Sequence, residues 1–307
     1  MHAPSGYVDL QVNGYADVDF NADELSVEAV AAVCRRLRDD GVAGILATVI
    51  TADLDAMCRR LANIVRVREA DKSIADMIWG IHIEGPFLNE EPGYIGAHPK
   101  KHARPAEVDA AKRLLEAAGG LTKIVTLAPE RDFDNRVTRF LAGQGVRVSG
   151  GHCNPTLDQL RSSIDAGLTL FTHLGNGCPG VLPRHDNIIQ RALSMSEHLH
   201  IGFIADGVHV PFHALANYLK CCGLDRAFIV TDAICGAGQG PGVFSIGDRR
   251  VVIDENLATW SEDRSHLVGS AGTMPRSAEN LGTALGFDDP QIRELLCDNP
   301  RNILGVR

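Results

Sequence analysis

The chain has 307 residues, of which 45% are hydrophobic and 22% charged, and its formal net charge is −9. This length and apolar content suffice for a large core, in one big domain or two small ones. Lys and Arg form no basic run, which argues against a nucleic-acid partner. The longest apolar stretch, residues 41–50, is far too short to cross a bilayer, so no membrane partner is expected.

The first residues are polar, with no apolar core of a signal peptide after them. The eight cysteines show neither a CxxC nor a zinc-knuckle spacing. Together these features predict reduced thiols and a cytoplasmic protein.

Short β-rich runs alternate with helix-like segments along most of the chain. Strands are predicted at residues 6–12, 41–50, 77–85, 122–130, 146–153, 168–175, 200–207 and 227–233. Helices are predicted within residues 24–41, 54–70, 105–120, 156–167 and 212–223. Thr156 and Asp288 are placed to cap helix starts, and Gly223 lies just past a helix end.

Apolar strands that alternate with amphipathic helices predict a parallel sheet covered by helices. Eight such units fit a closed (β/α)8 barrel; a doubly wound open sheet is the alternative, although no GxGxxG follows the first strand. After the eighth strand, residues 242–260 alternate like a β-hairpin with a turn at Gly247 and Asp248, and two helical segments follow. No linker interrupts residues 1–307, so we expect a single domain.

Side chains able to bind a ligand recur at the predicted strand ends. They are Gln11, Asn13, His82, Glu84, His152, His173, Asp206, His209 and Asp232. Each alone is more often a structural residue or a turn cap. In a parallel barrel, however, these strand ends meet at one face, which carries the active site.

Three of these residues have the chemistry of a metal site. Two histidines and a carboxylate commonly hold a catalytic divalent metal and leave a position for water, and Glu84, His152 and His173 are such a set. Asp232, at another strand end, would supply a general base.

The motifs DLQVNG, HIEGPFLN, GAHP, TLAPE, GGH, FTHLGN, ADGVHV, VTDA and GSAGTM occur in this order over nearly the whole chain. In this the chain resembles the N-acetylglucosamine-6-phosphate deacetylase family of the amidohydrolase superfamily. The resemblance implies a TIM barrel of the metal-dependent hydrolase type. It also implies a hydrolase of amino sugar metabolism, which converts N-acetylglucosamine 6-phosphate to glucosamine 6-phosphate and acetate.

The resemblance also implies roles for the residues at the metal site. Glu84, His152 and His173 would bind one divalent ion, zinc with iron as a substitute. Asp232 would take a proton from water and return it to the departing amine. His98, in GAHP, would polarise the acetyl carbonyl or hold the sugar.

Many amidohydrolases carry His-x-His at the end of the first strand and bind a second metal with it. This chain has Gln11 and Asn13 there. Amides are poor ligands for zinc-like ions compared with imidazole, so the pair is expected to mark a lost metal position. A single metal is therefore predicted.

On the substrate side, the resemblance implies contacts from several loops. The matching residues are Asn176, Gly177, Leu267, Val268 and Gly269, with Asp206 assigned to the same group. Arg184 and His209 match a pair that holds the 6-phosphate, sometimes from a neighbouring subunit, and a homodimer is implied. A surface salt bridge is an equally good interpretation of Arg184.

Two departures from the family pattern bear on function. Family members usually carry a small β-sandwich formed by their two ends; we expect it to be absent here, which makes the chain a divergent member. The substrate loops FTHLGNGCPG and PRHDN also differ from the usual pattern. Alternative substrates therefore remain: N-acetylgalactosamine 6-phosphate, an unphosphorylated N-acetyl sugar, or another amide. A non-catalytic sugar-phosphate binder is a further alternative.

Overall fold

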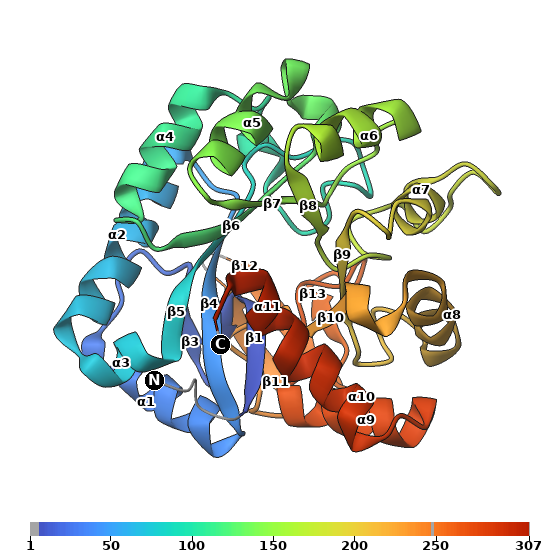
Figure 1. The fold of residues 1–307 in the computed structure, drawn as a ribbon. Coiled ribbons are helices and arrows are strands. Elements are labelled where there is room, and N and C mark those ends of the chain that lie inside the picture. The colour runs from blue at the N-terminus through green and yellow to red at the C-terminus, as the bar shows by residue number, and fades with distance from the viewer. Residues whose placement is uncertain (1–5, 247–248, 307) are drawn as a thin grey trace.

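The structure, a computed structural model, describes residues 6–246 and 249–306. Eight parallel strands lie side by side in chain order (Figure 1). They are β1 (Tyr7–Val12), β4 (Val42–Ile50), β5 (Ile78–Glu84), β6 (Thr122–Leu127), β7 (Arg147–Gly150), β8 (Leu168–Phe171), β9 (His200–Ile204) and β10 (Ala227–Val230). A parallel bridge between Val12, the last residue of β1, and Ala233, three residues after β10, joins the two ends of the sheet. The predicted (β/α)8 barrel is confirmed.

Helices surround the barrel (Figure 1). They are α1 (Val27–Asp39), α2 (Leu54–Ala70), α3 (Lys72–Met77), α4 (Val108–Ala117), α5 (Arg136–Gly143), α6 (Leu157–Asp165), α7 (Ile188–Ser194), α8 (Phe212–Cys222), α9 (Met274–Leu285), α10 (Asp289–Arg293) and α11 (Asn299–Leu304). The five segments predicted as helices correspond to α1, α2, α4, α6 and α8. The short helices α5 and α7 were not among them. None of the helices within the described residues is both long and apolar enough to span a bilayer.

Local sequence sets where several helices begin and end. Thr156 forms a capping box with Gln159 at the start of α6, and Asp288 forms one with Gln291 at the start of α10. Gly223 ends α8 with a φ of 81°, a value that glycine adopts without steric cost. The three predicted helix signals are confirmed.

The C-terminal helix α11 covers the end of the barrel from which the strands start (Figure 1). Its Ile303 belongs to the apolar cluster inside the barrel, together with Leu10 and Leu170. Arg301 donates a hydrogen bond to the carbonyl of Gly6, just before β1. With this end covered, the opposite end, where the strands finish, is the one that carries a pocket.

The segment after β10 is more than a hairpin. It forms a three-stranded antiparallel sheet from β11 (Gly242–Ile246), β12 (Arg249–Ile253) and β13 (Thr259–Ser261). The predicted hairpin is therefore confirmed in β11 and β12 and extended by a third strand; its turn at 247–248 lies outside the described residues. A second small hairpin, β2 (Gly14–Tyr15) and β3 (Val18–Asp19), follows β1.

Candidate metal centre and active site

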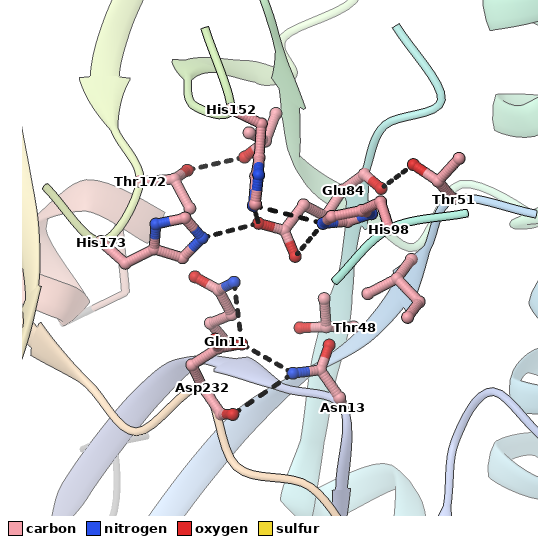
Figure 2. A network of polar contacts seen from close by, with 12 residues as sticks. Gln11, Asn13, Thr48, Thr51, Glu84, His98, His152, Thr172, His173 and Asp232 are labelled. Atoms are coloured by element: carbon pink, nitrogen blue, oxygen red, sulfur yellow. Dashed lines mark hydrogen bonds and ion pairs between the residues drawn. The ribbon is translucent and has the colours of Figure 1, made fainter. Parts of the chain in front are cut away.

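The predicted metal ligands meet at the carboxyl end of the barrel. Glu84 is the last residue of β5, whereas His152 and His173 each lie two residues after β7 and β8. Oε1 of Glu84 lies 2.9 Å from Nε2 of His173 and 3.3 Å from Nε2 of His152 (Figure 2). The three side chains are buried. Chain segments almost ninety residues apart are thus brought into direct contact by strand order alone.

His98 joins this cluster from the loop after β5. Its Nε2 atom lies 3.2 Å from Nε2 of His152 and 3.7 Å from Oε2 of Glu84. Ligand atoms of Glu84, His98 and His152 all lie within 4.8 Å of one another. The structure therefore places His98 beside the predicted ligands and close enough to be one.

The cluster fits a divalent metal ion. Nδ1 of His152 lies 2.8 Å from the carbonyl of Tyr94, and since a carbonyl only accepts, Nδ1 carries the proton. Nε2 of His152 then presents a lone pair toward Glu84 and His98, as a ligating histidine does. Nδ1 of His173 is buried without a hydrogen-bond partner among the described residues. One carboxylate and several imidazoles make a donor set typical of zinc or iron.

The close contacts in this cluster shift the pKa values of Glu84 and His173 so that each favours its charged form. Burial alone would raise the pKa of Glu84, but the close approach of the His152 and His173 imidazoles outweighs it and holds that pKa well below its usual range. Burial lowers the pKa of His173, yet the hydrogen bond to Glu84 raises it more. The pKa of Asp232 is raised, by burial first and then by the negative charge of Glu84.

Three site residues have a backbone conformation that residues with side chains rarely adopt. The φ angles are 50° at His152, 30° at His173 and 53° at Asp232. Each such residue costs about 1–3 kcal/mol and persists only where the surroundings impose it. The tight turns at these strand ends are part of what directs the three side chains toward one centre.

The amide pair at the end of β1 contacts Asp232. Nε2 of Gln11 donates to Oδ1 of Asp232 at 3.1 Å, and Nδ2 of Asn13 donates to the same oxygen at 2.7 Å (Figure 2). Both side chains are buried. The pair thus lies within the site, next to Asp232.

His82, the other polar residue near the end of β5, faces the barrel interior instead. Its Nδ1 atom lies 3.0 Å from the carbonyl of Leu10 and its Nε2 atom 2.7 Å from Oγ1 of Thr126. Thr126 in turn bonds to Thr172, and Thr172 to Ser149. Burial lowers the pKa of His82 to about 4, so this histidine is neutral and links the strands beneath the cluster of Glu84, His152 and His173.

A pocket of about 690 Å³ opens above the cluster. Its lining includes the predicted residues Asn13, Glu84, His98, His152, His173, Asn176, Gly177, His209, Asp232, Leu267, Val268 and Gly269. A Cβ atom on Gly177 would lie 2.7 Å from Nδ1 of His152, so this loop passes directly over a predicted ligand.

Two predicted substrate residues do not line this pocket. Asp206 lies behind His209, with its Oδ2 atom 2.6 Å from Nδ1 of His209, and also accepts a hydrogen bond from Ser270. Arg184 is exposed on the loop between β8 and α7. Asp206 therefore orients His209 instead of reaching the cavity, and Arg184 is not among the described residues that line the pocket.

Several lining residues, above all Trp260 and His266, were not predicted from the sequence. They belong to β13 and the loop after it, and Ile246 of β11 lines the same pocket. The hairpin pattern was visible in the sequence, but nothing in it indicated that this sheet would lie over the strand ends.

Comparison with known proteins identifies the family. No family model matches the chain. It is 33% identical to the N-acetylglucosamine-6-phosphate deacetylase of Bos taurus over 98% of its own length and 74% of that protein. Identity with the enzyme of that name from Bacillus subtilis (strain 168) is 30%, over 98% of this chain and 75% of that protein.

A solved structure agrees with these relatives. A mutant of the N-acetyl-D-glucosamine-6-phosphate deacetylase from Mycobacterium smegmatis, in complex with N-acetyl-D-glucosamine-6-phosphate, superposes with a TM-score of 0.88. It is 27% identical and matches 98% of this chain and 77% of that one. The chain belongs to the N-acetylglucosamine-6-phosphate deacetylase family.

Proposed function

We propose that the protein hydrolyses the acetamido group of N-acetylglucosamine 6-phosphate, releasing acetate and glucosamine 6-phosphate. The observation that carries this proposal is the meeting of Glu84, His152 and His173 in one pocket with Asp232. The named relatives support the same reaction and substrate.

Glu84, His152 and His173 would hold one divalent ion, zinc or in its place iron. We favour His173 over His98 as the third ligand because it follows a barrel strand, and ligands on rigid elements are held more exactly in place than those on loops. The ion, when bound, lowers the pKa of water toward 7 and so makes a nucleophile available at neutral pH.

Asp232 would transfer the proton, and His98 would stabilise the negative charge that develops on the acetyl oxygen. Asp232 lines the pocket beside the cluster, where its carboxylate can accept a proton from the attacking water. It would return that proton to the amine, which leaves poorly unless protonated. His98 would donate a hydrogen bond to the acetyl oxygen as negative charge develops there.

The sugar would lie under the insertion sheet, the three-stranded sheet of β11, β12 and β13. It would contact the loops that contain Asn176, Gly177 and the segment 267–269. The phosphate needs donors, and the described lining of the pocket contains histidines but neither Lys nor Arg. His209, oriented by Asp206, would supply one contact. Arg184 would supply a bidentate contact from a second copy of the chain, which makes a homodimer part of the proposal. We further propose that the protein is cytoplasmic.

A second candidate substrate is N-acetylgalactosamine 6-phosphate. One relative, 27% identical over 98% of this chain, is named N-acetylgalactosamine-6-phosphate deacetylase and comes from Escherichia coli O157:H7. Both sugars would present the same acetamido and phosphate groups, so the catalytic residues would act on either. Unphosphorylated sugars and non-catalytic binding are the remaining alternatives.

An acetate-release assay tests the proposal. Purified protein with measured metal content would be given N-acetylglucosamine 6-phosphate, N-acetylgalactosamine 6-phosphate and N-acetylglucosamine. We expect turnover of the first to exceed that of the other two. Metal-loaded protein that releases acetate from none of them would refute the proposal.

A matched pair of variants tests the ligand assignment. His173→Asn should lose the ion during dialysis, because one of its three ligands is gone. His98→Asn should keep the ion while losing activity. The opposite pattern of metal content would show that His98, not His173, completes the set.

A further inference from the structure

We propose that Gln11 and Asn13 are positioning residues that hold the carboxylate of Asp232 in the orientation required for proton transfer. The inference rests on the proposed function. It assigns Gln11 and Asn13 a role in the reaction, in addition to marking a lost metal position.

The geometry is a two-point clamp on a single oxygen. Nε2 of Gln11 and Nδ2 of Asn13 both donate to Oδ1 of Asp232, at 3.1 and 2.7 Å (Figure 2). An ionised carboxylate only accepts hydrogen bonds, so both amides must present their nitrogens.

The backbone ties the clamp to the same strand end. The backbone N–H of Asn13 donates to the carbonyl of Ala233 at 2.8 Å, and Val12 forms a bridge with Ala233. Asn13 also donates from its side chain to the carbonyl of Asp232, at 3.4 Å. The end of β1 therefore holds both the backbone and the side chain of the turn after β10.

Such a clamp matters for catalysis because a carboxylate has two equivalent oxygens and can rotate. With Oδ1 occupied by two donors, Oδ2 is the oxygen left to exchange a proton. A displacement of about 1 Å at a reacting group can cost on the order of 100-fold in rate. Charge-assisted hydrogen bonds to a carboxylate are about twice as strong as neutral ones, and two of them on one oxygen oppose that displacement.

A substitution at Gln11 can test positioning of Asp232 without removing a side chain that lines the substrate pocket. Asn13 lines the pocket, but Gln11 is not among the described residues that do. It lies beneath the pocket, beside a cavity of about 10 Å³ that Leu10 also lines. An effect of Gln11 on turnover would therefore not come from lining the substrate pocket, and Asp232 is the pocket residue to which its side chain donates a hydrogen bond.

The test compares Gln11→Met, which keeps the length of the side chain and removes its donor, with the control Leu10→Met on the same strand. Metal content, melting temperature, kcat and KM would be measured on metal-loaded enzyme with N-acetylglucosamine 6-phosphate. We expect kcat to fall on the order of 10-fold in Gln11→Met, with KM and metal content as in the control. Asn13→Leu should lower kcat likewise, which keeps the inference testable if one variant does not fold.

A double-mutant cycle shows whether the effect acts through Asp232. In an Asp232→Asn background, Gln11→Met should cause no further loss of the residual rate. An unchanged kcat in Gln11→Met, or the same loss with and without Asp232, would overturn the inference.

Crystal structures of the wild type and Gln11→Met decide the matter independently of turnover. We expect the carboxylate of Asp232 to leave its wild-type orientation in the variant, and an unmoved carboxylate would overturn the inference. If the wild type releases no acetate, the proposed function fails, whereas this comparison still decides whether the clamp orients Asp232.

Discussion

The buried carboxylate of Asp9 is predicted to make the stability of the barrel depend on pH. Asp9 lies on β1 and accepts hydrogen bonds across the seam of the barrel, from the hydroxyl and the backbone N–H of Thr231. Burial raises the pKa of Asp9 from its ordinary value of 3.8 to about 7, although these hydrogen bonds act to lower it. We predict that Asp9→Asn removes this dependence.

The magnitude follows from the two pKa values. The folded protein binds the proton of Asp9 more tightly than the unfolded chain does, so stability falls as the pH rises from about 4 to about 7. The difference between 3.8 and about 7 corresponds to about 4 kcal/mol, at about 1.4 kcal/mol for each pKa unit. An asparagine keeps an oxygen for the backbone N–H groups but does not titrate.

Urea unfolding of the wild type and Asp9→Asn, at about pH 5 and about pH 8, measures the effect. Between these two values, the difference in unfolding free energy should shift in favour of the variant by about 3 kcal/mol. His82, whose pKa is lowered by burial to about 4, acts in the opposite direction but is common to both proteins and cancels. A difference that stays constant with pH would refute the reasoning.

Two further predictions concern the pocket and a helix cap. Gly177→Ala should weaken metal binding and lower acetate release at least about 10-fold. The added Cβ would collide with His152, and the φ of 59° at Gly177 is strained for alanine. Metal content and activity would be compared with those of Gly180→Ala, whose Cβ meets nothing within 4 Å, and equal values would contradict the prediction. Thr156→Ala should lower the unfolding free energy by about 1 kcal/mol in urea titrations, because it removes the cap of α6; unchanged stability would exclude that role.

Chain order and residue type were enough to predict the barrel and the convergence of three polar side chains at one of its ends. Strands that run parallel in sequence order must all end at one face, so Glu84, His152 and His173 converge whatever the details of packing. The helix α5 escaped prediction because only eight residues form it, too few for Val137 and Leu141 to establish a helical period.

Contacts between side chains from distant segments could not be predicted in the same way. The hydrogen bond from Gln11 to Asp232 joins residues 221 positions apart, and only the closed seam brings them together. The place of Trp260 in the pocket likewise depends on how the insertion sheet folds over the strand ends. Local pattern describes each segment but carries no information on which atoms of two segments will touch.

The left-handed turns at His152, His173 and Asp232 have a consequence for how this protein can change. At each position φ is positive, a conformation that is strained for a residue with a side chain and that glycine adopts most readily. The two imidazoles and the carboxylate therefore add backbone strain to the barrel, which the proposed function would explain. Replacing any of these three residues by glycine would relieve that strain, so a loss of function at these turns need not be accompanied by a loss of stability.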